Sequence, residues 1–260
     1  MVKKLNKDRL VTYSLIFLVG IIGIILFFID KDQILESLQS NFVKGNNFVE
    51  LFKGLGNTIL ITLVAFLCGV FIGTILCLID GINSQNLCII LLKKVCKIYV
   101  SIFRGTPTMV QLLILYFVLF AFYKGNPLFV AILAFGLNSG AYVSEIIRGG
   151  IEAVPVGQME AGRSLGLSYF KTMRKIVFPQ ALRNSFPSLG NELITLLKET
   201  SIVGFVGAVD LTLAFRKIAN ATYDYKTVYL VMGVVYFFLV FLIAAILKRI
   251  ERRVLQHAKG

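Results

Sequence analysis

Three apolar runs in this sequence contain no Asp, Glu, Lys or Arg, and each is about as long as a bilayer core is thick. They span residues 10–29, 57–79 and 228–247. A helix needs roughly 20 apolar residues to cross the hydrocarbon core. Over the whole chain 57% of residues are hydrophobic and 16% are charged, whereas soluble domains have about 45–50% and 25%. The sequence therefore predicts an all-α membrane protein.

Shorter or more polar segments raise the expected number of transmembrane helices to about six. The predicted spans are residues 10–29, 57–79, 108–123, 127–147, 187–207 and 228–247. With both termini in the cytoplasm, 19 of the 27 Lys and Arg residues lie inside and 7 outside, with Lys198 within a span. This bias follows the positive-inside rule and predicts a multi-pass protein of the cell membrane. The net charge of +13 then reflects topology, so no nucleic-acid partner is expected.

Two of the predicted spans, 10–29 and 57–79, have further features in their sequences. Four basic residues precede span 10–29, as in a signal peptide, but its apolar run is longer than a signal h-region and no small-residue cleavage site follows. We therefore interpret it as a retained membrane helix. Span 57–79 contains Gly69 and Gly73, four residues apart on one face. This spacing favours close packing against another helix.

Catalytic, metal-binding and nucleotide-binding sites find no support in the sequence. The four cysteines lack metal-ligand spacing, and the single histidine, His257, lies in the tail. Neither a metal site nor a catalytic centre is predicted. A phosphate-binding G-x-x-x-x-G-K-[ST] loop is also lacking, so the chain itself is not expected to bind ATP.

The polar stretch 148–187 joins the fourth and fifth spans, and it is much longer than a simple connection needs. Pro155 suits the first turn of a helix, and Gly166 suits a left-handed helix end. Ser168 offers an N-cap for a second helix, which Pro179 stops or kinks. The sequence predicts a short helix, a glycine break and another short helix. We expect this segment to bind a partner.

Part of this stretch, EAGRSLGLSYFKTMRKIVFPQAL, resembles the EAA loop of ABC-importer permeases. The matching residues are Glu160, Ala161, Gly166, Ile176 and Pro179. Gly162 stands where the family usually has a second Ala, which lowers helix propensity by roughly 1 kcal/mol but leaves the pattern intact. The resemblance implies that the loop forms a coupling helix, which docks into a groove on a cytoplasmic ATPase subunit.

The resemblance extends over residues 48–247. Segments similar to the polar amino-acid branch of the family are NFVELFKGLGNTILITLVAFLCGVFIGTIL, SIFRGTPTMVQLLILYF, LNSGAYVSEIIRGGIEAVP and NELITLLKETSIV. They imply a five-helix permease core at 48–247. An extra transmembrane helix and an external segment precede it in 1–47, and a basic cytoplasmic tail follows in 248–260.

The same resemblance implies the permease subunit of an ATP-driven importer for polar amino acids. Its expected partners are a dimer of cytoplasmic ATPase subunits, a second permease copy or a homologous permease, an extracellular solute-binding protein and the lipid bilayer. ATP and Mg are expected on the ATPase subunits, and no cofactor on this chain. An ion-coupled secondary transporter or channel is the alternative, which predicts transport without ATP. A membrane-embedded enzyme is a further rival, but it lacks a catalytic constellation.

A polar arc marks the fifth span. Five polar or charged residues fall within about 120° of its circumference at roughly 100° per residue. Such a stripe is costly against lipid and has to face protein or water. The expected substrate-path residues are Asn138, Glu145, Asn191, Glu192, Thr195, Lys198 and Glu199. Their excess of acids over bases favours a basic or neutral polar substrate, although the charged groups have the alternative of pairing only with neighbouring helices.

Overall fold

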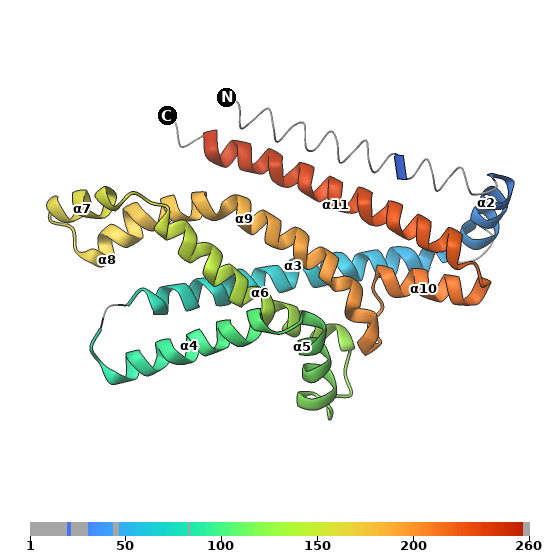
Figure 1. Cartoon of the computed structure of the whole chain (residues 1–260), viewed down its shortest axis with the longest axis horizontal. Coiled ribbons are helices and arrows are strands. Elements are labelled where there is room, and N and C mark those ends of the chain that lie inside the picture. The colour runs from blue at the N-terminus through green and yellow to red at the C-terminus, as the bar shows by residue number, and fades with distance from the viewer. Residues whose placement is uncertain (1–19, 22–30, 44–46, 83, 257–260) are drawn as a thin grey trace.

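The computed structural model describes residues 20–21, 31–43, 47–82 and 84–256. Every secondary-structure element in these ranges is helical, which confirms the predicted all-α class. The predicted first span, 10–29, lies outside the described residues except for two positions. The elements in Figure 1 are α2 (Lys31–Leu38), η1 (Gln39–Val43), α3 (Asn47–Asp80), α4 (Leu87–Gly105), α5 (Thr108–Ile114), η2 (Leu115–Leu119), α6 (Pro127–Glu152), α7 (Val156–Ser164), α8 (Tyr169–Thr172), η3 (Met173–Val177), α9 (Phe178–Glu199), η4 (Thr200–Val206), α10 (Leu211–Thr222) and α11 (Tyr225–Gln256).

Three helices of the described chain are long and apolar enough to cross a membrane: α3, α6 and the part of α11 from Tyr225 to Arg253. A fourth crossing results if α4 and the segment Thr108–Leu119 are counted as one span, with a bend of 110° between them. Most of the predicted span 187–207 lies in α9, which begins earlier, at Phe178. Since α9 carries several charged residues, it is not one of the three apolar helices.

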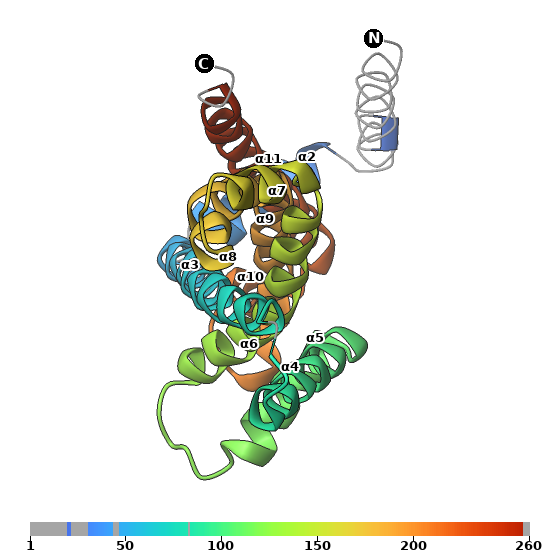
Figure 2. The ribbon, with the colours of Figure 1, turned by 90° about the vertical axis from the view of Figure 1, so that its left-hand side faces the viewer.

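The long helices lie side by side, and α7 and α8 lie at the end where α6 finishes and α9 begins (Figure 1). Figure 2 views the molecule from that end. It shows α4 and α5 on one side of α3, α6 and α9, and α11 on the other side. The contacts agree, because α6 packs against α3, α4 and α9, whereas α11 packs against α9 and α10. Helix α6 is therefore the centre of the bundle.

Small residues bring α3 and α6 into close contact. A Cβ added to Gly69 would lie 2.6 Å from Oγ of Ser139, and one added to Gly73 would lie 2.7 Å from the backbone N of Ser144. Both distances are shorter than any van der Waals contact, so side chains at these positions would push the helices apart. The G-x-x-x-G spacing seen in the sequence is thus the packing surface of α3.

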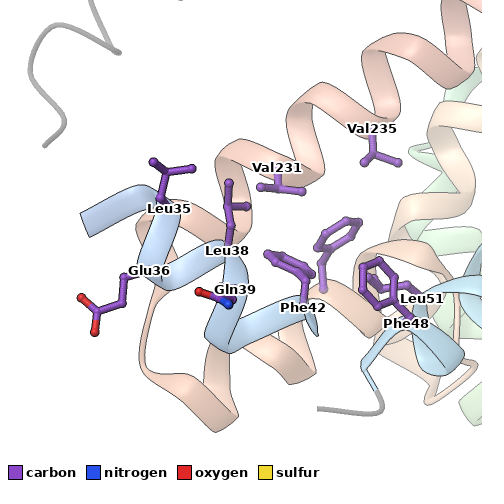
Figure 3. Close-up of a pocket in the computed structure, with 10 residues that line it drawn as sticks. Leu35, Glu36, Leu38, Gln39, Phe42, Phe48, Leu51, Val231 and Val235 are labelled. Atoms are coloured by element: carbon purple, nitrogen blue, oxygen red, sulfur yellow. The ribbon is translucent and has the colours of Figure 1, made fainter. Parts of the chain in front are cut away.

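An apolar groove of about 710 Å³ lies beside α2 (Figure 3), and α2 is at the end of the bundle opposite α7 and α8 (Figure 1). Helix α2 and η1 form one wall of it, and α3, α10 and α11 form the others. Its lining residues are Leu35, Glu36, Leu38, Gln39, Phe42, Phe48, Leu51, Phe215, Val231 and Val235. The segment before α3 therefore covers the ends of α10 and α11 incompletely.

Candidate functional site

The predicted coupling loop forms two short helices beyond the ends of α6 and α9. Pro155 is the N-cap of α7, and Gly166, just past its end, has a φ of 77°. Ser168 is the N-cap of α8, where its Oγ accepts a hydrogen bond from the backbone N–H of Lys171 at 3.3 Å. The predicted order of helix, glycine break and helix is confirmed up to this point.

The structure around the end of α7 explains two glycines of the loop, Gly162 and Gly166. The N–H of Gly166 donates to the carbonyl of Arg163 at 3.0 Å, and the N–H of Leu167 donates to the carbonyl of Gly162 at 3.2 Å. This pair of bonds is the Schellman motif, which requires a left-handed residue at Gly166. A Cβ added to Gly162 would collide with Cγ2 of Thr172 in α8. Glycine therefore stands in place of the family's usual Ala because α8 packs directly against it.

The outer surface of α7 and α8 is apolar as well as charged. Glu160 and Ala161 are exposed, and so are Leu165, at 80%, and Phe170, at 69%. Exposed apolar groups gathered in this way mark protein-interaction sites. The sequence alone did not single out Leu165 and Phe170, because apolar residues in short helices are equally consistent with burial.

In the second half of the loop, Pro179 does not stop the helix, although a stop was one of the two outcomes predicted for it. Helix α8 continues through η3 into α9, and Pro179 is an exposed residue in the first turn of α9. The π-helix η3 holds the half-buried Ile176 and directly precedes the proline. A π turn is wider than an α turn, so it accommodates a residue that lacks an N–H and that crowds the preceding turn.

The polar arc of α9 divides into an outward and an inward part. Asn191, Thr195 and Lys198 are exposed. Glu192 is only 9% exposed, and its Oε1 accepts a hydrogen bond from Oγ of Ser139 in α6 at 2.8 Å. Glu199, which is partly buried, lies 3.4 Å from Oγ1 of Thr108, the first residue of α5. The two acids therefore face neighbouring helices, and the other three residues face away from the bundle.

The outward part continues toward α7 and α8 over two further turns, which the sequence analysis had not included. Its exposed polar residues are Asn184, Ser188, Asn191, Thr195 and Lys198, and we refer to them as the α9 stripe. Their spacing of 4, 3, 4 and 3 residues is that of one helical face. This regular spacing is the sequence signal that could have identified Asn184 and Ser188.

Asn138 does not join the α9 stripe but holds the bend between α4 and α5. Its Nδ2 donates to Oε1 of Gln111 at 2.9 Å. The Nε2 of Gln111 in turn lies 2.8 Å from the carbonyl of Phe103 and 2.9 Å from that of Thr106. Asn138 and Gln111 are both buried. The bend, which we call the elbow, is thus closed by one amide side chain and fastened to α6 by another.

Glu145 lies in a cluster of charges near the elbow. Its Oε2 is 3.3 Å from a guanidinium nitrogen of Arg104 and 2.6 Å from one of Arg148, and Arg148 also pairs with Glu152. A cavity of about 480 Å³ beside this cluster separates part of α4 from α3 and α6. No hydrogen bond or ion pair in the described part of the chain joins Asn138 or Glu145 to the polar residues of α9.

Among the described residues, no group of three or more His, Cys, Asp or Glu side chains is placed to bind a metal ion. The free cysteines are instead distributed over α3 and α4, and two of them, Cys77 and Cys96, line the cavity beside the elbow.

Known proteins share both the sequence and the arrangement of these helices. The chain is 39% identical to a putative glutamine transport system permease protein of Rickettsia typhi over 79% of its own length and 93% of the relative. It is 37% identical to the arginine transport system permease protein ArtQ of Bacillus subtilis, over 78% and 91%. A crystal structure of an amino acid ABC transporter with histidines contains a chain with 38% identity and a TM-score of 0.73, covering 79% of this chain and 94% of that one.

A family model also matches this chain. Residues 90–256, which include the elbow, the coupling loop and the α9 stripe, match the model described as the inner membrane component of binding-protein-dependent transport systems. These matched residues make up more than half of the chain. The chain therefore belongs to the family of binding-protein-dependent transport system inner membrane components, the permease subunits of ABC importers.

Proposed function

We propose that this permease carries a polar amino acid, with glutamine and arginine as the first candidates. Relatives named for the transport of these two amino acids match most of the chain at 37–39% identity. The acids Glu192 and Glu199 outnumber Lys198 in this part of α9, although both acids face neighbouring helices. A basic or neutral polar substrate fits this excess, because a second negative charge would lack a partner.

The observation that carries the energy-coupling part of the proposal is the surface of α7 and α8. Gly162 and the Schellman turn fix the two helices against each other, while Glu160, Leu165 and Phe170 remain uncovered. A rigid, uncovered surface of this kind suits a protein groove. We assign that groove to a cytoplasmic ATPase subunit, which would bind ATP and Mg, and whose closure would move α7.

The α9 stripe supports a substrate path between two permease chains. A row of five exposed polar residues including Lys198 is costly against lipid tails. The single chain leaves this row uncovered, so a second copy or a homologous permease is needed to enclose it. Substrate would reach the path from an extracellular solute-binding protein, with both termini of the chain and the coupling loop in the cytoplasm.

Reconstitution tests the proposal. The complex purified with its native partners would be placed in proteoliposomes, and uptake of labelled glutamine and arginine would be followed with and without ATP on the ATPase side. We expect uptake that requires both ATP and the binding protein. Uptake that persists without ATP and follows an ion gradient would instead establish the alternative, an ion-coupled transporter.

A charge reversal in the same complex tests the docking surface. Glu160→Lys is expected to leave the chain in the membrane but to release the ATPase subunit or uncouple its turnover. Glu251→Lys near the end of α11 makes the same charge change outside the loop and serves as the matched control. If Glu160→Lys retains a normal amount of ATPase and normal uptake, α7 is not the docking surface.

A further inference from the structure

The elbow between α4 and α5 is stiff. Thr106 and Pro107 are extended between the two helices, which meet at 110°. Gln111 spans the inside of the turn and binds the carbonyl groups of Phe103 and Thr106. Because the amide of Gln111 is buried and Asn138 satisfies its oxygen, opening the turn would leave the buried side chains of Gln111 and Asn138 without these partners. The elbow therefore moves as a unit rather than unfolding.

The same elbow has free space beside it. The cavity of about 480 Å³ is bounded by Cys96, Lys97 and Ser101 on α4 and by residues of α3 and α6 on its other walls. The cavity is open to the surface, since the side chains of Lys97 and Arg104 on its wall are 71% and 44% exposed. Helix α4 is thus fastened to α6 through Asn138, which donates to the carbonyl of Phe103, and through the hydroxyl of Tyr99, which is bound to the carbonyl of Leu137. Beside the cavity, the ion pair of Arg104 with Glu145 is what joins the two helices.

A chain of charges links the elbow with the coupling loop. Arg104, at the end of α4, pairs with Glu145, and Glu145 pairs with Arg148 one turn along α6. Arg148 also pairs with Glu152, the last residue of α6, which lies four positions before the start of α7. The chain Arg104–Glu145–Arg148–Glu152 therefore runs along one face of α6, from the elbow to the base of the coupling helix.

The ion pairs of this charge chain are partly exposed. The side chains of Arg104 and Arg148 are each 44% exposed and that of Glu145 is 30% exposed, and ion pairs at such exposure add little to stability. Arg104 also has a second contact on α6, since its guanidinium carbon lies 5.6 Å from the ring centroid of Tyr142, one turn from Glu145. It can thus shift along α6 without losing all favourable contacts.

From these four observations we infer that the charge chain Arg104–Glu145–Arg148–Glu152 transmits displacement of the coupling helix to the elbow, and that α4 swings into the adjacent cavity when it does so. Arg104 and Glu145 are positioning residues for transport and do not touch the substrate. This assigns to Glu145, and to Asn138 as the clamp of the elbow, a role different from the substrate contact that the sequence suggested. The inference rests on the proposed docking of α7 to an ATPase.

The first experiment measures the number of substrate molecules carried per ATP hydrolysed, in the reconstituted complex. Glu145→Gln is expected to lower this ratio at least fivefold, because ATP hydrolysis continues while the elbow no longer moves with the coupling helix. Lys97→Gln is the matched control: it removes a charge from the same cavity, where Lys97 pairs with Asp80 at 3.6 Å, but lies outside the chain of charges. Arg104→Lys keeps the charge at the elbow and is expected to stay within twofold of the unmodified complex.

Three results would overturn the inference. Uptake and ATP hydrolysis that fall in parallel in Glu145→Gln would show a structural role only, as would loss of the ATPase subunit from both Glu145→Gln and Arg104→Lys. An equal fall of the ratio in Lys97→Gln would show that any charge in the cavity matters. If the unmodified complex shows no ATP-dependent uptake, the proposed function itself fails, which is distinguishable from all three.

A second experiment tests the movement of α4 directly. Ser101→Cys and Ser144→Cys place thiols on the α4 and α6 walls of the cavity, in a background without the four natural cysteines. Bridging them with a short bifunctional thiol reagent should abolish uptake while ATP hydrolysis continues, and each single variant treated alike should be unaffected. Normal uptake by the bridged protein would show that α4 does not close the cavity, and the inference would be wrong.

Discussion

The side-chain amide of Asn41 donates a hydrogen bond to Oδ2 of Asp224 at 2.8 Å, joining two residues 183 positions apart. Asn41 lies in η1 and is almost fully buried. Asp224 precedes α11 and also accepts a bond from the backbone N–H of Thr227 at 3.0 Å. The carboxylate of Asp224 thus caps the beginning of α11 and also holds η1, in the segment before α3, over the ends of α10 and α11. The apolar groove of Figure 3 exists because the segment is fixed there.

Asp224 is expected to stabilise this end of the protein in a pH-dependent way. Burial by itself raises the pKa of Asp224, but hydrogen bonds from Thr227, Ser37 and Asn41 outweigh it and hold the pKa below its ordinary value. An acid with a lowered pKa contributes stability above the pKa of the unfolded chain and loses it as the pH falls through the folded value. Asp224→Asn should therefore lower the Tm of the detergent-solubilised protein at pH 7, by an amount that corresponds to about 1–3 kcal/mol.

The difference between Asp224→Asn and the unmodified protein should shrink when the Tm is measured at successively lower pH. Glu36→Gln, on the same segment at the rim of the groove, removes an exposed carboxylate and provides the control, which should change the Tm little. A Tm difference that stays constant down to acidic pH would show that the charge of Asp224 is not what holds the segment.

The packing of Gly162 against Thr172 predicts a second result. Gly162→Ala restores the residue usual in the family but introduces a methyl group where Cγ2 of Thr172 lies. Overpacking of this kind costs about 1–3 kcal/mol, so α7 should be displaced from α8 and the bound ATPase subunit should dissociate more readily. Thr172→Ser removes the opposing methyl group, and the double variant should recover ATPase binding. If the Gly162→Ala variant binds the ATPase subunit normally, the contact between α7 and α8 accommodates the added methyl group and the prediction is wrong.

Local signals accounted for the parts of the fold that were predicted from sequence. The glycine break at Gly166 and the N-cap at Ser168 depend on the chemistry of a few neighbouring residues, and both were found where expected. The permease family was indicated by motifs spread over the chain and is confirmed by the comparisons. The continuation of the helix through Pro179 could not be predicted, because the π turn before it depends on the path of the whole segment.

Contacts between helices account for what the sequence could not show. The arc on α9 was visible as a pattern, but only the fold separates Glu192, bound to Ser139, from the outward-facing Lys198. The partnership of Asn138 with Gln111 requires the bend after α4, whose angle is a tertiary property. Residue type and spacing thus identified the polar groups, and packing decided which of them face a neighbour.

The orientation of the chain leads to a third prediction, which rests on the distribution of Lys and Arg. The variants Lys124→Cys and Ser164→Cys would each carry a single cysteine, in a background without the natural ones. The two cysteines should react differently with an impermeant thiol reagent added outside intact cells. Both positions are exposed, and neither caps a helix, unlike the nearby Asn126 and Ser168. We expect labelling at 124 only. Labelling at 164 instead, or at both, would reject cytoplasmic placement of the coupling loop.

The α9 stripe gives the last prediction. An amino-acid zwitterion in a path of low dielectric needs a partner for its carboxylate and another for its ammonium, since an unpaired charge there is very costly. Lys198 faces outward and suits the carboxylate, whereas Glu199, near Thr108 at the beginning of α5, suits the ammonium or a basic side chain. Lys198→Met and Glu199→Gln should each lower uptake roughly tenfold, equivalent to about 1.4 kcal/mol, while basal ATP hydrolysis and assembly survive. Lys226→Met, an exposed lysine at the start of α11, should leave uptake unchanged. If instead the complex falls apart in both α9 variants, these residues hold helices together and the binding protein alone selects the substrate.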